Sequence, residues 1–205
     1  MNKKIIMILV GVLLVGAIGG PSVRPYQPEG IWEAVGYTAS NTAKFTQDHG
    51  EALYRRSLYT FWKRTVPHPT LSTFDVPDRE VCTARRPKTN TPLQALATMN
   101  DTIQLEAARK LAERMLHEGG STPTERLTFA FHLATAREPK SDERSTLSSF
   151  LTRRLQVYHK DPAAAQAFLT EGASKVDPKI DPVELAAYAN VASLILNLDE
   201  TITRN

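Results

Sequence analysis

Cysteine is almost absent: Cys82 is the single one in 205 residues. One cysteine excludes a disulfide within the chain, and it excludes the paired-cysteine patterns of structural zinc sites and covalently attached haem. A lipoprotein anchor is excluded as well, because no cysteine stands directly after the apolar run at the N-terminus. The five histidines show no metal-ligand spacing. We therefore expect neither a metal nor any other cofactor.

A large excess of charge of one sign is also missing. The formal net charge is +3, and Lys3 and Lys4 account for two of these charges. Between residues 55 and 88, however, eight Lys and Arg residues stand against three Asp and Glu residues. Nucleic-acid-binding proteins usually spread a larger surplus over a whole face. We therefore expect no nucleic-acid partner, and we expect a basic surface confined to this segment.

The chain lacks an apolar run long enough to span a membrane. The longest run covers residues 5–18, directly after Lys3 and Lys4. At ~1.5 Å per residue it falls short of the ~30 Å hydrocarbon core of a bilayer. Its length and flanks are typical of a secretory signal, with cleavage after Ala17, or alternatively after Gly19 or Gly20. We predict that residues 1–20 are a signal peptide, or a membrane anchor if uncleaved, and that the protein is exported to the periplasm or cell surface.

Strand signals are missing, because no segment shows sustained alternation or a hairpin turn. Helical periodicity is frequent, and the hydrophobic content of 41% is sufficient for one sizeable core. The predicted fold is all-α: an irregular bundle of five to six helices in one domain, residues 21–205, with a long ordered Pro- and Arg-rich loop over residues 70–88. The helices are expected over residues 51–65, 91–118, 122–138, 141–159 and 161–171, and from residue 181 onward.

Two helix starts follow the same local pattern. Thr91 and Thr122 stand at the N-cap, proline follows at the first helical position, and Gln94 or Glu125 stands at the capping-box position. Ser141 is expected to cap a further helix. The predicted buried stripe of the helix over residues 91–118 consists of Leu93, Leu96, Ile103, Ala107, Leu111 and Met115.

Four blocks of the sequence resemble a known family. Residues 55–101 read RRSLYTFWKRTVPHPTLSTFDVPDREVCTARRPKTNTPLQALATMND, and the other blocks are GGPSVRPYQPEGIWE (19–33), ERLTFAFHLATAREP (125–139) and LILNLDETITR (194–204). They resemble the planctomycete-specific C-terminal domain of unknown function, which occurs in large exported planctomycete proteins that also carry cytochrome c domains. The resemblance covers the C-terminal part of that domain. It implies an exported setting near cytochrome c domain proteins, and it implies no established activity.

The loop over residues 70–88 leaves several interpretations open. Asp75 and Asp78 could act as an acid/base pair, and the loop arginines could hold an anionic group. Alternatively, Asp75 and an arginine from this loop or the preceding helix could form a buried or half-buried pair that fixes a loop without strands, whose backbone polar groups need partners. Cys82 with His68 could be a thiol nucleophile with its base, although a lone cysteine is more often a small buried residue.

The segment that precedes the loop carries interleaved aromatic and basic residues. Tyr54, Tyr59, Phe61 and Trp62 could stack on sugar rings or bases, or they could form a core stripe with arginines over their faces. Asn100 and Asp101 are poor helix formers in the middle of an expected helix. They either hydrogen-bond the adjacent loop or mark a functional kink.

The leading hypothesis is an exported, non-catalytic binding or scaffold module. Its partners would be cytochrome c domain proteins or an anionic cell-surface polymer, with membrane contact only through an uncleaved N-terminal segment. The alternative is an extracellular hydrolase acting on carbohydrate or ester substrates, which would use Asp75 or Asp78 with His68. The candidate binding surface consists of Arg55, Arg56, Arg64, Asp75, Arg79, Arg85, Arg86, Asn100 and Asp101.

Overall fold

The computed structural model describes residues 20–27, 32, 45–63, 67–85, 87 and 89–202. The chain divides into two compact units, Met1–Asn90 and Thr91–Asn205, here called the N-terminal unit and the C-terminal unit. The predicted signal or anchor segment lies outside the described residues, except for Gly20. None of the described helices has the length and apolar character needed to cross a membrane. The prediction of a single domain over residues 21–205 stays a prediction.

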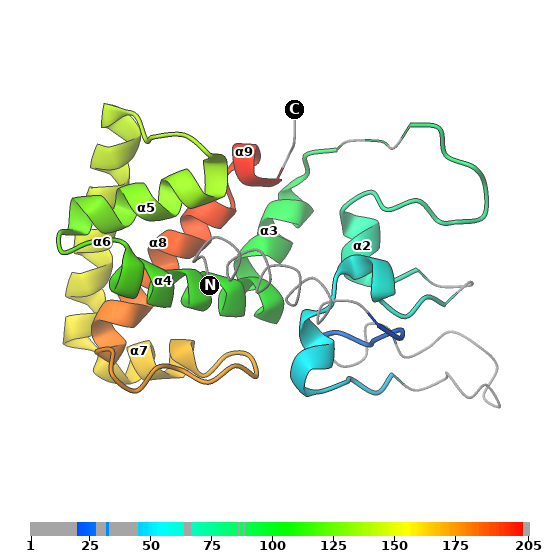
Figure 1. The fold of residues 1–205 in the computed structure, drawn as a ribbon, viewed down its shortest axis with the longest axis horizontal. Coiled ribbons are helices and arrows are strands. Elements are labelled where there is room, and N and C mark those ends of the chain that lie inside the picture. The colour runs from blue at the N-terminus through cyan, green and yellow to red at the C-terminus, as the bar shows by residue number, and fades with distance from the viewer. Residues whose placement is uncertain are drawn as a thin grey trace, which may run out of the picture. The chain divides into compact units, whose positions relative to one another are not determined.

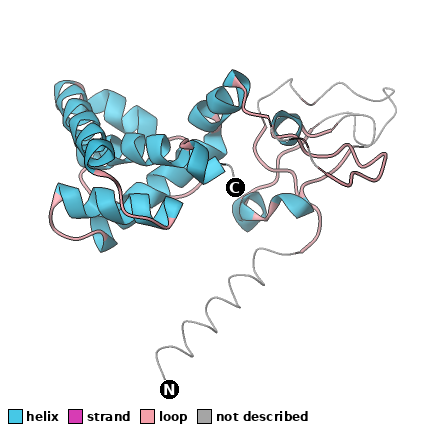
Figure 2. Ribbon diagram, turned by 90° about the horizontal axis from the view of Figure 1, so that it is seen from above, coloured by secondary structure: helices cyan, strands magenta, loops and turns pink. Residues whose placement is uncertain are grey.

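The predicted all-α fold class is confirmed, with more helices than the five to six expected (Figures 1 and 2). No strand occurs among the described residues, where Val23 and Thr60 form an isolated parallel bridge. The described elements are the 3-10 helices η1 (Gly50–Tyr54) and η2 (Ser57–Tyr59) and the α-helices α2 (Pro69–Thr73), α3 (Pro92–Asn100), α4 (Thr102–Glu118), α5 (Pro123–Thr135), α6 (Ser141–Lys160), α7 (Pro162–Leu169), α8 (Pro182–Leu196) and α9 (Asp199–Ile202).

The helix predicted over residues 51–65 is wrong. This segment forms η1 and η2 and then continues as extended chain through residues 60–63. Pairing with a distant segment explains the difference: the Val23 amide donates to the Tyr59 carbonyl at 2.8 Å, and the Phe61 amide donates to the Val23 carbonyl at 2.7 Å. A helix would need the Phe61 amide for its own i→i−4 hydrogen bond. The tertiary pairing therefore overrides the local helical pattern.

Trp32 is the centre of the N-terminal core, with only 1% of its surface exposed. Its ring lies 5.2 Å from Phe45, 6.1 Å from Phe61 and 5.0 Å from His68, centroid to centroid. The Lys63 ammonium lies 5.3 Å from the Trp32 ring centroid and donates to the Trp32 carbonyl oxygen at 3.4 Å. These contacts hold segments that are far apart in the sequence in one small core.

The predicted loop over residues 70–88 begins instead with the short helix α2. His68 caps this helix, because its Nδ1 accepts a hydrogen bond from the Leu71 amide at 3.4 Å. Proline at the first helical position removes a donor that would otherwise lack a partner. After Phe74 the chain continues without regular structure to residue 91 among the described residues.

Helix α8 is the central element of the C-terminal unit. It contacts α3, α4, α5, α6, α7 and α9, and Figure 1 shows it behind α4 and α5. A helix that is apolar on all sides is typical of a core position, and alanines allow its neighbours to approach closely. The expected inward residues Leu185, Tyr188, Ala192 and Ile195 are buried, and Ala186, Ala187, Ala189 and Val191 are buried as well.

The single helix predicted over residues 91–118 is wrong, because the chain breaks at Asp101 into α3 and α4. Leu111 and Met115 are buried as expected, whereas Leu93, Leu96, Ile103 and Ala107 are exposed. The break turns α3 so that polar residues, Gln94 and Thr98, face inward. The Thr98 hydroxyl donates to the Asn197 side-chain oxygen, which gives this polar face a specific partner.

A buried ion pair on α4 holds the segment between α7 and α8. Glu106 and Arg109 are only 3% and 2% exposed. The Arg109 guanidinium donates to the carbonyls of Leu169, Glu171 and Ser174, and the Glu106 carboxylate accepts from the Ser174 amide at 2.5 Å. The two side chains therefore satisfy backbone groups of a segment that has no helix of its own.

The connection between α5 and α6 is fixed by one arginine. The Arg137 guanidinium makes two hydrogen bonds to Glu143 and two to Glu200, at 2.7–2.8 Å, and lies 4.8 Å over the Phe131 ring. The prediction that Ser141 caps the next helix is wrong. Lys140 occupies the N-cap position of α6, and Ser141 is its first residue. Glu143 accepts from the Lys140 amide at 2.7 Å, so this carboxylate replaces the predicted serine cap.

The Glu143 contacts predict acid sensitivity. Hydrogen bonds from Arg137, followed by the Lys140 amide, lower the pKa of Glu143 from 4.5 to about 2. The unfolded chain therefore takes up this proton first, and the stabilisation, complete above pH 4.5, is lost as the pH falls from 4.5 towards 2. Circular dichroism melts should show a smaller fall in midpoint across this window for Glu143→Gln than for the wild type. Equal falls in both proteins would refute the assignment.

Candidate functional site

The predicted basic surface belongs to the N-terminal unit, and its described arginines are mostly exposed. Arg56, Arg79 and Arg85 are exposed, and Arg55 is half-buried. The Arg55 guanidinium donates to the Pro21 carbonyl at 2.7 Å, and the Arg79 guanidinium lies 4.4 Å over the Trp62 ring. Two further candidates, Arg64 and Arg86, lie outside the described residues.

These four arginines form no ion pair in the part of the chain that the structure describes. In the C-terminal unit, by contrast, Arg109, Arg114, Arg126 and Arg137 each pair with a glutamate. Arg55 is instead held by a carbonyl and Arg79 by an aromatic ring, contacts that leave their positive charges without a carboxylate. An external anion can therefore approach them without breaking an ion pair. Arg144, Arg153 and Arg154 of the C-terminal unit likewise form no ion pair among the described residues.

The loop carboxylates brace the loop. Asp75, with a left-handed φ of 57°, accepts hydrogen bonds from the Thr89 amide at 2.8 Å and from the Thr89 hydroxyl at 2.7 Å. Asp78 accepts from the Glu80 amide at 3.1 Å. Asp75 thereby joins the two ends of the loop. Both carboxylates accept from backbone amides of the loop itself. They stabilise the loop in this way, and among the described residues no arginine forms the expected ion pair with Asp75.

His68 and Cys82 lie in different surroundings. The His68 side chain is 3% exposed, and burial lowers its pKa from 6.5 to about 4. No hydrogen bond joins it to Asp75, Asp78 or Cys82, all of which are described. Cys82 is exposed, so the expectation of a small buried cysteine is wrong. Among the described residues, the predicted acid/base and thiol partners are therefore not joined by hydrogen bonds.

Asn100 and Asp101 form the junction of two helices. The Asn100 side chain donates to the Leu96 carbonyl at 2.8 Å, and Asp101 caps α4 by accepting from the Ile103 amide at 3.0 Å. Partial burial raises the pKa of Asp101, and this amide opposes the shift. Of the two alternatives, hydrogen bonding to the adjacent loop is not observed, since both side chains bond to α3 or α4, and the pair marks a break between these helices.

The aromatic residues near the basic segment are divided between core and surface. Phe61 packs on Trp32, and the Arg24 guanidinium lies 5.0 Å over the Phe61 ring. Tyr54 is 48% exposed. Arginines thus lie over aromatic faces, as one interpretation predicted, but on extended chain rather than on a helix.

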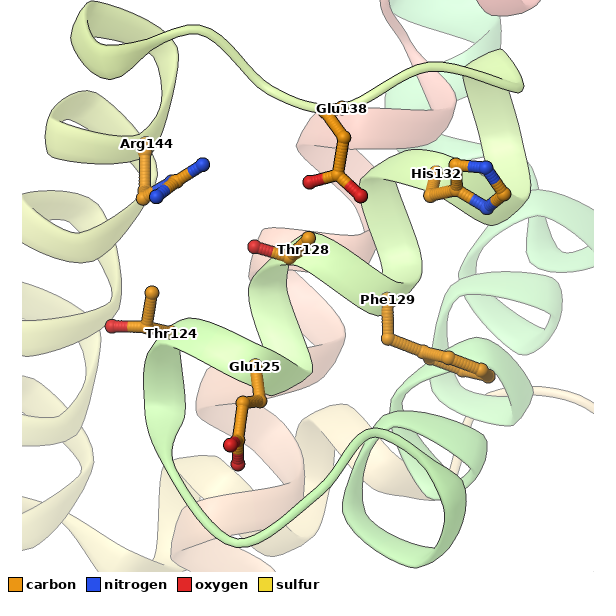
Figure 3. A pocket seen from close by; sticks show the side chains of 7 residues that line it. All are labelled: Thr124, Glu125, Thr128, Phe129, His132, Glu138 and Arg144. Atoms are coloured by element: carbon orange, nitrogen blue, oxygen red, sulfur yellow. The ribbon is translucent and has the colours of Figure 1, made fainter.

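The C-terminal unit has a hollow that no sequence pattern predicted. It has a volume of about 440 Å³ and opens on the outer side of α5 (Figure 3). Spacing along α5 brings most of its side chains together, but Glu138 and Arg144 come from the connection and from α6. We call it the α5 hollow; it is lined by Thr124, Glu125, Thr128, Phe129, His132, Glu138 and Arg144.

Neither unit shows a metal centre: among the residues that the structure describes, no three His, Cys, Asp or Glu side chains are grouped to hold an ion. The fold and surface thus define an all-α protein with a basic N-terminal unit and a helical C-terminal unit.

The chain belongs to the PSD1 family, described as a protein of unknown function (DUF1553), whose model matches residues 6–151. The resemblance to a domain of unknown function is thereby confirmed, whereas the planctomycete and cytochrome c associations stay predictions. No curated protein and no solved structure matches the chain.

Proposed function

We propose that the protein is an exported binding module that holds an anionic cell-surface polymer on the basic surface of its N-terminal unit. The observation that carries the proposal is that four arginines of this unit, Arg55, Arg56, Arg79 and Arg85, form no ion pair within the described residues. Export and an origin beside cytochrome c domain proteins belong to the same proposal and rest on the sequence resemblance.

Two features suit these arginines to a polymer rather than to a compact ligand. They lie on separate segments, with Arg55 and Arg56 between η1 and η2 and Arg79 and Arg85 on the loop after α2. The loop is shaped by Asp75 and Thr89, so the arginines lie on a braced segment. Arginine suits such a role because its planar guanidinium binds carboxylate, sulfate or phosphate groups through two hydrogen bonds.

Replacing two loop arginines should weaken polymer binding. For Arg79→Gln with Arg85→Gln we expect earlier elution from immobilised heparin, a sulfated polysaccharide, in a salt gradient. Each lost contact removes roughly one released counterion, so the slope of log K against log salt should become shallower by up to about two. The matched control replaces two exposed cations of the C-terminal unit, Arg153→Gln with Lys160→Gln.

The control also decides the outcome. Wild-type binding that does not change with salt would contradict the proposal, and so would an equal loss in the control pair. Retention of the wild type by an immobilised cytochrome c domain, without retention by the polysaccharide, would assign the surface to a protein partner instead.

A further inference from the structure

The α5 hollow holds two opposite charges that do not pair with each other. Glu138 reaches it from the connection after α5, and Arg144 reaches it from the first turns of α6. Figure 3 shows both charged groups extending into the same opening from different sides. Within the part of the chain that the structure describes, neither residue has an oppositely charged side-chain group within 4.0 Å. The one side-chain hydrogen bond of Arg144 is a long one, 3.4 Å, to the Pro139 carbonyl.

Two other arginines of the α5–α6 region do form ion pairs. Arg126 pairs with Glu184 at 2.7 Å, and Arg137 next to Glu138 pairs with two glutamates at 2.7 Å. Glu138 and Arg144 are both exposed, so neither charge needs a partner within the protein. They are, however, positioned so that a ligand can reach both at once.

The wall that carries Glu138 is rigid. The preceding residue, Arg137, is fixed by four hydrogen bonds to Glu143 and Glu200, and the following residue, Pro139, is buried. The backbone of Arg144 belongs to the first turn of α6, where its amide donates to the Lys140 carbonyl at 2.9 Å. Binding therefore requires little ordering of the backbone, which lowers the entropic cost of holding a ligand.

The floor of the hollow supplies the remaining contacts. Figure 3 shows Thr128 below Glu138, with Thr124 and Phe129 on either side of it along α5. Phe129 is half-buried, and the Arg114 guanidinium lies 5.8 Å from its ring centroid. Hydroxyl groups and a partly covered aromatic ring suit a ligand with amide groups and an apolar side chain.

We propose that the α5 hollow binds short peptides with free termini, with the ammonium group at Glu138 and the carboxylate at Arg144. The ligand must carry both charges, because Glu138 and Arg144 are the charged groups of the hollow without a charged partner among the described residues. The other carboxylate in its lining, Glu125, already accepts from the Ser121 and Thr122 amides. The ligand must also separate its two charges, since the two protein groups lie farther apart than an ion pair. A dipeptide with an apolar residue meets these conditions. The site is independent of the polymer surface on the N-terminal unit.

The test is a titration of the full chain with glycyl-leucine, followed by NMR of the isotope-labelled protein. We expect saturable shifts of amides on α5 and at the start of α6, with weak affinity. Glu138→Gln and Arg144→Gln should each raise the dissociation constant about fivefold, as loss of one exposed charge pair implies. The controls Glu171→Gln and Arg153→Gln, both exposed residues outside the hollow, should leave it unchanged.

Modified ligands identify which charge meets which residue. N-acetylglycyl-leucine lacks the ammonium group and should bind the wild type more weakly than glycyl-leucine does. The Glu138→Gln variant should bind both ligands with equal affinity. Glycyl-leucinamide lacks the carboxylate, and Arg144→Gln should no longer distinguish it. Absence of saturable shifts in the wild type would overturn the proposal, and so would equal discrimination by both variants. Unchanged circular dichroism of the variants would show that they are folded.

Discussion

Arg109→Met is expected to lower the free energy of unfolding of the C-terminal unit by about 3–5 kcal/mol, the usual cost of removing one partner from a buried ion pair. The Glu106 carboxylate would remain buried without its cation. The carbonyls of Leu169, Glu171 and Ser174 would lose their donors as well. Methionine has a similar reach but cannot replace any of these hydrogen bonds.

Arg114→Met is the matched control, because Arg114 is also on α4 and also pairs with a glutamate one turn away. That pair is exposed, and exposed pairs contribute little to stability. Urea unfolding followed by far-UV circular dichroism would measure both variants. Glu106→Gln should fall between them, since glutamine can still accept from the Ser174 amide. Equal midpoints for Arg109→Met and Arg114→Met would contradict a stabilising role for the buried pair.

The N-terminal unit should lose stability in mild acid because of His68. Burial lowers the pKa of this imidazole from 6.5 to about 4, so the unfolded chain binds a proton at pH values where the folded chain does not. The contribution of the neutral side chain is complete above pH 6.5 and is lost as the pH falls towards 4. One pKa unit corresponds to 1.36 kcal/mol, so the loss amounts to about 3 kcal/mol at the end of this window.

Both tryptophans of the chain, Trp32 and Trp62, lie in the N-terminal unit, so their fluorescence follows this unit alone. Urea midpoints should fall between pH 6.5 and pH 4 in the wild type. They should fall much less in His68→Asn, which keeps a side chain able to cap α2 but does not titrate. His159→Asn, at an exposed position, is the control. A wild-type midpoint that is constant across the window would refute the prediction.

Helix starts were predictable because their causes lie within four residues. The capping boxes at Thr91 and Thr122 form as expected, with the hydroxyls accepting from the Gln94 and Glu125 amides. The helix over residues 51–65 failed for the opposite reason, since pairing with Val23 decides the conformation there. Sequence patterns indicate local conformational preferences. Hydrogen bonding to a segment more than thirty residues away does not change the spacing of apolar residues, so it cannot be predicted from that spacing.

The candidate sites show the same division. Composition located the basic surface, but only the structure shows that its described arginines, Arg55, Arg56, Arg79 and Arg85, form no ion pair among the described residues. Asn100 and Asp101 were recognised as a helix interruption, yet their role as a junction depends on hydrogen bonds to α3 and α4. The α5 hollow could not be predicted, because it depends on the path of the chain between α5 and α6. That path places Glu138 and Arg144 beside α5.

The position of α8 bears on how the protein can be divided for expression. Residues 6–151 define the family match, and residue 151 lies within α6. Helix α8, residues 182–196, lies beyond that boundary but packs against α4, α5 and α6. A fragment ended at residue 151 would leave Leu111, Met115 and Phe131 without the helix that covers them. The region matched by the family model therefore ends before the helix that completes the core of the C-terminal unit. An expressed fragment should extend at least through residue 196.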